Sequence, residues 1–433
     1  MATLHDYAAT MSTARHIIEK DPAAADLVHV VTSFTDADFV LRSKEFAVLT
    51  AADGYGRDVQ APILGETLTR VDGPEHFQRR RIEAALFRSP AMRANEALVL
   101  RPAVDRVLAE LQQEQGTEIV RADLHDISEQ ALGEIVAALI GLDGLATAEG
   151  RAKFDSYYQD IDNGVRITWA RDDVERLAET GIRALNQLVA DFVQPAAERR
   201  TRLLEAVANG DAEPDAVPTD LITLMLENHA SYSGVDTSLM AREIALFITA
   251  SITTLTNQLC YCVQHIEEWV KEHPEDADKR TDTHFLYRVL QESIRLHAGP
   301  VLMRKAVSAQ VLPSGEHVPA GHFLWVVIRQ ASKDSQIFGA DADSFNPRRE
   351  IAAGALPYGV EFGVGRHTCI GKRFALGDDP DSPDAPDALQ GAGVTVLRRL
   401  YQEGMRLDPD AARTFVPELL DVHASMPILL QGR

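Results

Sequence analysis

The sequence predicts a mainly helical protein (α+β) with small β-sheets near both ends of the chain. Long segments repeat apolar residues at spacings of three and four, with charged residues between them, which is the period of an amphipathic helix. Strand-like runs are fewer, short and bounded by turn residues. The sequence contains no internal repeat and no clear interdomain linker. We therefore expect one domain over residues 1–433.

The predicted elements follow one another along the chain. Strand-like runs lie at residues 28–34, 315–332 and 423–431. Strongly amphipathic helical segments lie at residues 97–114, 121–142 and 173–210. Two stretches are expected to be exposed loops, because their clustered aspartates and prolines oppose a packed element. These are residues 210–218 and 378–387.

The composition limits the class of protein. The chain is 45% hydrophobic and 25% charged, an ordinary globular composition with enough residues for a large core. Its formal net charge of -22 argues against nucleic-acid binding, which needs clustered cations facing phosphate. The beginning of the chain has no basic segment followed by an apolar run, so we expect no signal peptide. Three cysteines form no disulfide framework and favour a reducing, cytoplasmic location.

One apolar segment, residues 244–264, has about the length of a membrane span. It carries no charged residue, but Thr, Ser, Asn and Gln side chains are spread along it. Such polarity fits a long helix through the centre of a protein better than a helix that faces lipid. We therefore expect a buried helix and no membrane span.

Cys369 differs from the other two cysteines. Cys260 and Cys262 lie two residues apart in the apolar helix and point to different sides of it, as buried thiols do. Cys369 lies in the stretch FGVGRHTCIG, where glycines let the backbone turn tightly so that amide hydrogens can point at the sulfur. No second cysteine lies nearby, which leaves a structural zinc or an iron–sulfur cluster short of ligands. A single thiolate suits haem iron.

Five residues of this stretch match the signature F-x-x-G-x-H-x-C-x-G, through which the chain resembles the cytochrome P-450 family. They are Phe362, Gly365, His367, Cys369 and Gly371. The resemblance runs from about Val28 to Leu430 and is to the soluble bacterial branch, including enzymes of secondary metabolism. It implies the triangular-prism fold, with heme b (iron protoporphyrin IX) bound through Cys369.

A second motif of the family lies upstream of the cysteine. Glu292 and Arg295 are three residues apart on a predicted helix, and alone they indicate no more than a surface ion pair. The resemblance implies the E-x-x-R pair, which holds a segment called the meander and has a structural role. Phe345, Pro347 and Arg349 stand at the expected places in that segment.

Haem propionates need cations, preferably planar donors that match a carboxylate. The resemblance implies four such residues at family positions. They are His76, Arg80, Arg304 and His367. Taken alone, without the cysteine stretch, His76 and Arg80 would be interpreted as residues on the solvated face of a helix.

The apolar helix resembles the family's central helix, which carries A-G-x-[DE]-T across the distal haem face. The aligned residues are Thr249, Ala250, Ser251, Ile252 and Thr253, followed by Thr254. Thr253 keeps the alcohol and is the candidate catalytic residue, whereas Ile252 replaces the acid and cannot carry a proton. Losing a positioned acid–base group lowers the rate of the step that it serves by ~10²–10⁴-fold. A different acid, a water chain along the helix hydroxyls, or a group of the substrate remain as replacements.

Electron donors of this family dock beside the cysteine stretch, so the resemblance implies a ferredoxin and a ferredoxin reductase as partners. Arg366, Lys372 and Arg373 are candidates for a basic docking patch, with solvated surface charge as the alternative. The aspartates at 378–387 interrupt the helix that normally follows, and they either guard this patch or select a partner.

The resemblance implies a monooxygenase that oxidises a small, mostly apolar organic substrate. Candidate pocket residues come from 55–64, the central helix, the segment after the E-x-x-R helix and 423–426. The particular candidates are Phe247, Ala250, Ser251, Ile252, Val301, Leu302, Ser425 and Met426. The missing acid leaves two alternatives open: an unusual haem enzyme (peroxide-driven oxygenase, nitric-oxide-reducing enzyme, or coupling or rearrangement catalyst) and a haem-binding protein without turnover.

Overall fold

The structure is a computed structural model that describes residues 3–7, 14, 17–19, 22–54, 57–166, 174–232, 237–297, 299, 301–381, 388–416 and 422–432. It confirms the mainly helical class with small sheets. The chain forms two compact units, so the expected single domain over residues 1–433 stays a prediction. Unit 1 comprises Met1–Leu49, Glu118–His125 and Asn257–Gly432, and unit 2 comprises Thr50–Thr117 and Asp126–Thr256.

Unit 1 contains all of the described strands. They are β1 (Val28–Val31), β2 (Phe46–Ala47), β3 (Ile119–Asp123), β4 (Leu302–Ala306), β5 (Gln310–Val311), β6 (His317–Val318), β7 (Phe323–Val326), β8 (Arg406–Leu407), β9 (Thr414–Phe415), β10 (His423–Ser425) and β11 (Pro427–Gln431). The largest sheet has the order β1-β7-β4-β2, and a second has the order β3-β11-β8. Two-stranded sheets pair β10 with β9 and β5 with β6.

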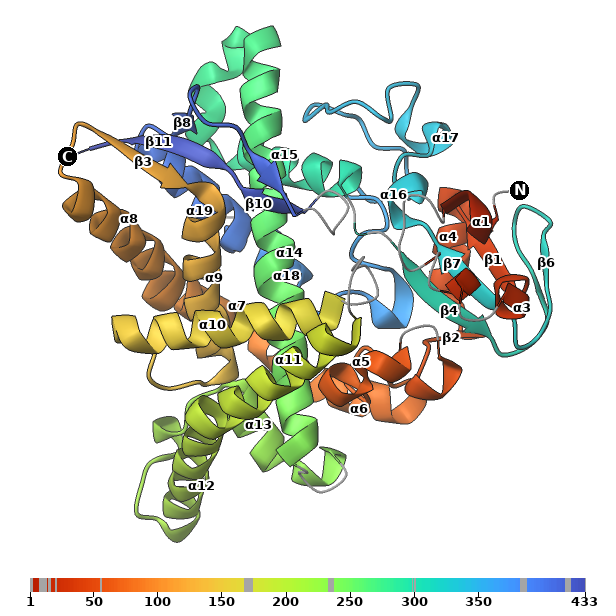
Figure 1. The fold of residues 1–433 in the computed structure, drawn as a ribbon, viewed down its shortest axis with the longest axis horizontal. Helices are drawn as coiled ribbons and strands as arrows, with labels where there is room; N and C mark the ends of the chain where they lie inside the picture. Colours follow the sequence, from red (N-terminus) through yellow and green to blue (C-terminus); the bar gives the residue numbers. More distant parts are fainter. Residues whose placement is uncertain are drawn as a thin grey trace. The chain divides into compact units, whose positions relative to one another are not determined.

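Unit 1 also contains helices, of which α4 packs on the largest sheet. They are α1 (Leu4–Tyr7), α3 (Pro22–Ala25), α4 (Phe34–Arg42), η8 (Pro274–Thr281), α15 (Thr283–Leu296), α16 (Ile328–Ala331), α17 (Ser335–Phe338), η9 (Gly365–His367), α18 (Lys372–Leu376) and α19 (Gly391–Gln402). Figure 1 shows β1, β7 and β4 side by side with α4 near them. Val40 and Leu41 of α4 pack in one core with Leu324 and Val326 of β7, because the helix turns its apolar face to the sheet.

Unit 2 is helical. Its helices are η1 (Ala51–Asp53), α5 (Arg57–Leu64), α6 (Gly73–Glu83), η2 (Ala84–Phe87), α7 (Ser89–Asn95), η3 (Glu96–Leu100), α8 (Arg101–Gln115), α9 (Leu124–Ile140, in unit 2 from Asp126), α10 (Ala148–Val165), α11 (Val174–Leu188), η5 (Val189–Val193), α12 (Gln194–Asn209), η6 (Pro214–Ala216), α13 (Leu221–Glu227) and η7 (His229–Tyr232). α14 (Thr237–Glu272) starts in unit 2 and continues into unit 1 at Asn257.

A contact between two glycines lets α10 and α11 run closely together (Figure 1). A Cβ atom added to Gly164 of α10 would lie 3.0 Å from the Cα atom of Gly181 on α11. The same Cβ would lie 2.9 Å from Cδ1 of Ile63 on α5, a side chain that is fully buried. Glycine has no side chain, so the three helices pack closely here, and a larger residue at Gly164 or Gly181 would push them apart.

Most predicted elements are present, but several boundaries differ. The strand-like runs form β1, β6 with β7, and β10 with β11, but residues 328–331 of the second run form the helix α16. The segment 121–142 begins as a strand, because β3 pairs antiparallel with β11 through Asp123 before α9 starts at Leu124. Within the loop 378–387, residues 382–387 lie outside the described residues.

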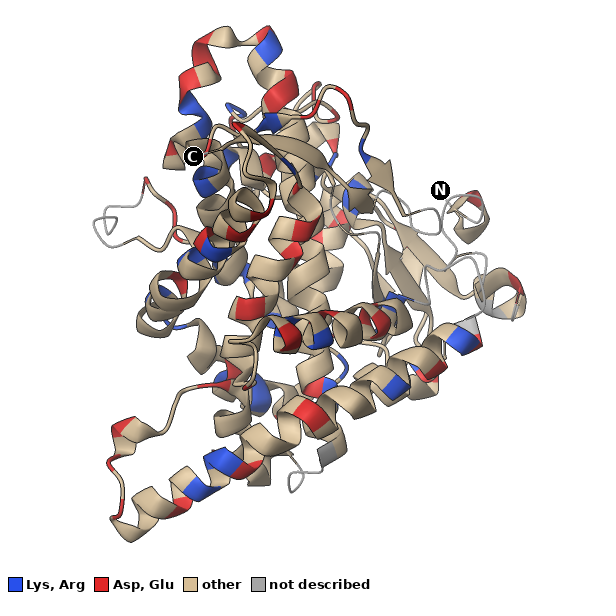
Figure 2. Ribbon diagram, turned by 60° about the vertical axis from the view of Figure 1, so that its left-hand side comes forward, with Lys and Arg blue, Asp and Glu red and all other residues tan. Residues whose placement is uncertain are grey.

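The apolar segment 244–264 lies within α14 and forms the long buried helix that was expected. Ser238–Glu272 is the one described helix that is long and apolar enough to cross a membrane. Of its most apolar stretch of 18 residues, 72% is buried within the protein. Such burial is typical of the core helix of a soluble protein. Figure 2 shows Lys and Arg interspersed with Asp and Glu along the described helices. The absence of a nucleic-acid partner stays a prediction.

Candidate active site

The cysteine stretch forms a closed turn. Gly363 and Gly365 have φ values of +62° and +73°, which glycine adopts without the strain that a side chain would cause. The amide of Cys369 donates to the carbonyl of Phe362 at 2.6 Å, and the amide of Thr368 donates to the carbonyl of Gly365 at 3.2 Å. These two bonds fold the chain back on itself. The turn therefore fixes the position of the Cys369 side chain.

The turn is anchored on the four-stranded sheet and on α4. A Cβ atom at Gly365 would lie 2.9 Å from the Cα atom of Arg42, so the backbone of the turn lies directly on the end of α4. The guanidinium of Arg366 donates to the carbonyl of Phe46, in the strand β2, at 3.0 Å. Val364 is buried in the same core as β7. These contacts hold the first half of the turn against α4 and the four-stranded sheet.

Cys369 is exposed, whereas Cys260 and Cys262 are buried. Burial raises the pKa of the Cys262 thiol to about 12, so that thiol stays protonated and is a poor metal ligand. All three cysteines lie among the described residues, and Cys369 alone offers an accessible sulfur. Gly371 lies beside this sulfur, since its Cβ position is 3.8 Å from the Cys369 Sγ atom.

The donor set around Cys369, among the described residues, fits haem. Among the described residues, no group of three or more His, Cys, Asp and Glu side chains could hold a metal ion. A lone thiolate therefore needs a metal that brings its other ligands with it, as the iron of a porphyrin does. In the same unit, Arg304 lies on β4 opposite Leu324 of β7, and its side chain is buried. His367 lies on η9, half-buried.

The other two predicted propionate ligands lie on α6 in unit 2. This helix begins at Asp72, whose side chain caps it by accepting from the amide of Gly73 at 3.0 Å. His76 and Arg80 are four residues apart and thus on one face. His76 is buried and Arg80 is half-buried. Their role toward haem stays a prediction.

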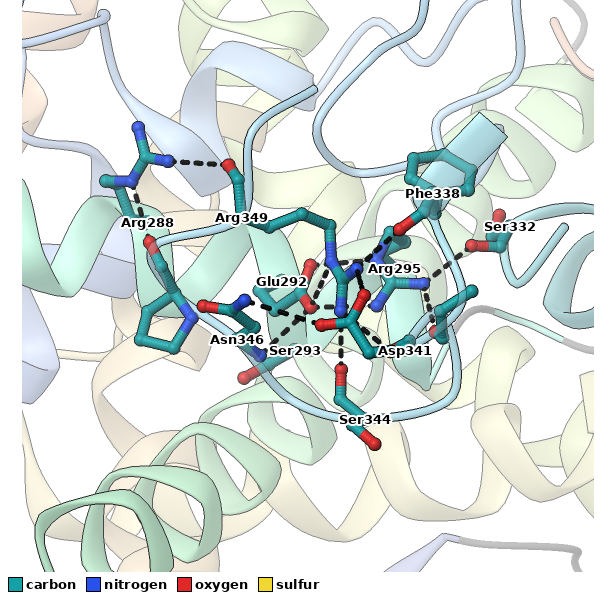
Figure 3. A network of polar contacts seen from close by, with 12 residues as sticks. Arg288, Glu292, Ser293, Arg295, Ser332, Phe338, Asp341, Ser344, Asn346 and Arg349 are labelled. Carbon is teal, nitrogen blue, oxygen red and sulfur yellow. Dashed lines mark hydrogen bonds and ion pairs between the residues drawn. The ribbon is translucent and has the colours of Figure 1, made fainter. Parts of the chain in front are cut away.

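Glu292 and Arg295 form a buried ion pair rather than a surface one. Arg295 donates to both carboxylate oxygens of Glu292 at 2.8 Å, and Arg349 donates to the same carboxylate at 3.0 Å (Figure 3). Arg295 also donates to the carbonyls of Ser332 and Ala342 at 2.9 and 2.7 Å.

The segment that holds Phe345 and Pro347 is tied into the same network. Asn346 donates its amide to Glu292 at 3.1 Å, and Arg288 donates to the carbonyl of Pro347 at 2.7 Å (Figure 3). Arg349 donates to the Asp341 carboxylate at 2.7 Å and to the carbonyl of Ser344 at 2.8 Å. These contacts lock α15 to residues 332–349, which supports the structural role that was expected of the pair.

The middle of α14 presents two different faces. Ala250 and Thr254 are exposed, and they are four residues apart on one face of the helix. Ile252 is completely buried, and Thr253 is only 7% exposed. Ser251 is half-buried. A ligand that lies along the exposed face would therefore meet Ala250 and Thr254 first.

Thr253 is hydrogen-bonded to a residue that is distant in the sequence. Its hydroxyl and the hydroxyl of Tyr158 on α10 form a short hydrogen bond in which either oxygen can donate. When Thr253 is the donor of that bond, the Tyr158 hydroxyl donates to Oε1 of Glu129 on α9 at 3.3 Å. Burial, with the charges of Asp162 and Glu129, raises the pKa of Tyr158 well above its ordinary value. Sequence reasoning missed Tyr158 and Glu129, because no local pattern links them to α14.

The three cations of the predicted docking patch have partners within unit 1. Arg373 forms a bidentate pair with Asp378 at 2.6 and 2.8 Å. Lys372 donates to the hydroxyl of Tyr358 at 3.3 Å, and Arg366 is held by backbone carbonyls as described above. The first aspartate of the acidic loop thus neutralises one residue of the patch.

The predicted pocket residues lie in several places. Phe247 is buried and stacks on Phe87 with ring centroids 6.2 Å apart. Val301 and Leu302 are half-buried, Met426 is buried, and Ser425 donates to Asp123. Of residues 55–64, Tyr55 and Gly56 lie outside the described residues. The assignment of these residues to a pocket stays a prediction.

Sequence reasoning also missed Glu361, the residue just before Phe362. Its carboxylate accepts from the amide of Gly299 at 2.7 Å, in the segment between α15 and β4. Desolvation raises the pKa of Glu361 to about 7, with the amide acting in the opposite direction. This contact joins the cysteine turn to the segment that leads to Val301.

An accessible thiol on a glycine turn, supported by a buried E-x-x-R network in a mainly helical chain, defines a haem-thiolate type of protein. The sequence profile of the family described as Cytochrome P450 matches residues 26–377, so the chain belongs to the cytochrome P450 family. Members of this family are haem-binding monooxygenases that hold protoporphyrin IX.

Similar proteins agree with this assignment. A bifunctional cytochrome P450/NADPH–P450 reductase 2 of Bacillus subtilis is 29% identical over 39% of this chain and 18% of that protein. Cytochrome P450 107B1 of Saccharopolyspora erythraea is 23% identical over 77% of this chain and 72% of that protein. The structure of epothilone D-bound cytochrome P450epoK has a TM-score of 0.68 at 17% identity, covering 99% of this chain and 98% of the other, and shows a shared fold. The chain spans 18% and 24% of the first two curated relatives that it matches, both bifunctional proteins.

Proposed function

We propose that the protein is a haem-thiolate monooxygenase in which Cys369 is the iron ligand. The observation that carries this proposal is the accessible Cys369 thiol on its closed glycine turn, in a chain of the cytochrome P450 family. The reaction inserts one oxygen atom of dioxygen into a C–H bond of the substrate and releases the other as water, with two electrons and two protons consumed. Haem, when bound, supplies the oxygen chemistry.

The chain's own residues bind and orient the cofactor. Gly363 and Gly365 hold the turn that carries the exposed Cys369, and Gly371 leaves room beside its sulfur. Arg304 and His367 in unit 1, with His76 and Arg80 in unit 2, are proposed to bind the propionates as cations matched to carboxylates.

We propose a small, mostly apolar organic substrate, bound near Ala250 and Thr254 on the exposed face of α14. Phe247, Ser251, Ile252, Val301, Leu302, Ser425 and Met426 remain proposed pocket residues. A ferredoxin and its reductase are proposed as electron donors, and the cytoplasm as the location.

The iron ligand is tested by the absorption spectrum of the ferrous carbon monoxide complex. The wild-type holoenzyme is expected to give the red-shifted Soret band that a thiolate ligand produces. C369S should lose that band, and C262S, which changes a buried thiol, should keep it. A C369S protein with the unchanged band would refute the assignment of Cys369.

The substrate is sought by optical titration of the ferric holoenzyme with terpenoids, steroids, fatty acids, macrolides and small aromatics. A saturable shift from low spin to high spin with one class identifies it as the ligand that displaces water from the iron. If none of these compounds causes a shift, the proposal of a free, small apolar substrate is contradicted.

A further inference from the structure

We propose that Glu129, Tyr158 and Thr253 form a proton relay that feeds the central helix α14 in place of the acid missing at Ile252. The inference rests on the proposed function, because a monooxygenase consumes protons at that helix. It assigns a route and two residues, Glu129 and Tyr158, that neither the family signature nor the sequence pattern points to.

The relay is a continuous chain of oxygen atoms. The Thr253 hydroxyl is hydrogen-bonded to the Tyr158 hydroxyl, and the Tyr158 hydroxyl is 3.3 Å from Oε1 of Glu129. The inner end is enclosed, since Tyr158 is 2% and Thr253 7% exposed. The outer end is half-buried, so the Glu129 carboxylate can exchange protons with solvent. A buried path with one end near water is the arrangement that proton transfer requires.

Other groups on α14 are poorer candidates. Ile252 has no proton and is completely buried. The hydroxyl of Thr249 donates to the carbonyl of Ala245 at 2.8 Å within the helix. Glu243 is ten residues before Thr253, roughly 15 Å along the helix axis, and it accepts from the amide of Leu68. The contacts of Thr253, in contrast, lead directly to a carboxylate.

Burial, more than any neighbouring charge, keeps the Tyr158 phenol protonated, because it raises the pKa of Tyr158 well above its ordinary value. The charges of Asp162 and Glu129 act in the same direction, whereas the Thr253 hydroxyl and Arg166 oppose them. A phenol that stays protonated can pass a proton on only while it receives another. Tyr158 is therefore suited to transfer and not to storage.

One transfer moves one proton through three oxygen atoms. Once the Glu129 carboxylate has taken a proton from solvent, it passes that proton to the Tyr158 oxygen, while the Tyr158 proton passes to Thr253 Oγ1. Thr253, which is 7% exposed, gives its original proton to an oxygen atom of a water molecule or ligand that contacts its hydroxyl. Glu129 then takes the next proton from solvent. No electron moves, and each hydroxyl ends with one proton, as it began.

The first test measures the relay without turnover, in the diamagnetic ferrous carbon monoxide form of the holoenzyme. In protein labelled with ¹³C at tyrosine Cζ, a slowly exchanging hydroxyl gives a split resonance in a mixture of H₂O and D₂O, from which its exchange rate follows. Y158F assigns the resonance. E129Q is expected to slow the exchange of the Tyr158 hydroxyl by about tenfold or more, because it removes the group that supplies the proton. An unchanged or faster exchange in E129Q would overturn the proposal, since exchange would then occur by local opening alone.

The second test measures dioxygen consumption by the holoenzyme with a surrogate ferredoxin and ferredoxin reductase. Y158F and E129Q are expected to lower the rate by about tenfold or more. Y157F is the matched control, because Tyr157 lies next to Tyr158 but donates to Asp191 at 2.7 Å on the surface. Equal rates for Y158F and Y157F would refute the relay.

The two proposals fail in different ways. A wild-type protein without the thiolate band in its carbon monoxide complex refutes the proposed function, whatever the hydroxyl exchange shows. A protein with that band, whose Tyr158 exchange ignores E129Q, keeps the proposed function and refutes the relay.

Discussion

Replacing Arg295 by alanine is expected to destabilise unit 1 severely. Arg295 is completely buried and donates to both oxygens of Glu292 and to the carbonyls of Ser332 and Ala342. Breaking a buried ion pair by removing one partner costs ~3–5 kcal/mol, because the other charge stays buried. The two carbonyls left without a donor add ~1–3 kcal/mol each at most, and the remaining contact of Arg349 with Glu292 offsets part of the loss.

The expected net loss of about 4 kcal/mol in the free energy of unfolding is a large share of the ~5–15 kcal/mol of a typical domain. It would be measured by urea unfolding of R295A and wild type at pH 7, followed by far-ultraviolet circular dichroism. R348A is the matched control, because Arg348 is half-exposed and Asp276, its partner, keeps contacts to Lys279 and Trp269. The control should lose less than ~1 kcal/mol. If R295A lost no more than R348A, the network would not hold α15 as described.

Three further substitutions test other parts of the chain. The pKa of Glu361 is raised to about 7, so the folded protein favours its neutral form, and the free energy of unfolding should fall as pH rises from 5 to 8. This fall is expected to be up to ~3 kcal/mol. Urea unfolding of E361Q should show no such fall. Burial lowers the pKa of His297 to about 2 and that of His265 to about 3, so the free energy of unfolding should decrease as pH falls below 6.5. In H297F this decrease should be smaller than in wild type, by up to ~1.4 kcal/mol per pH unit. An equal decrease in both proteins would contradict this. G365A should abolish haem retention on gel filtration because its Cβ would strike α4, whereas G315A, a left-handed glycine with open space around it, should retain haem.

Much of the fold was predictable because local patterns dominate it. The amphipathic period located the long helices, and the spread of polar side chains along the uncharged segment 244–264 indicated a buried helix. The boundary at residues 121–123 was not predictable in this way, because pairing with β11 at the other end of the chain overrides the helical pattern there.

In the candidate site too, the features formed by residues close together in the sequence were the predictable ones. The cysteine turn was predictable, since its glycines, thiol and spacing all lie within ten residues. The contact of Tyr158 with Thr253 joins residues 95 positions apart, and nothing in the sequence near either of them marks it. The pairing of Arg373 with Asp378 was also missed, although the two are close in sequence, because a basic residue gives no sign of whether its partner is internal.

The pairing of Arg373 with Asp378 has a kinetic consequence for electron transfer. Long-range attraction between oppositely charged surfaces accelerates the encounter of two proteins, and added salt removes the gain over a Debye length of about 8 Å at physiological ionic strength. A guanidinium already matched by a carboxylate at 2.6 Å projects little field toward an approaching donor. The donor would thus gain less electrostatic steering than three unmatched cations would give, and the rate of reduction of the haem should vary less with salt than it would for such a patch.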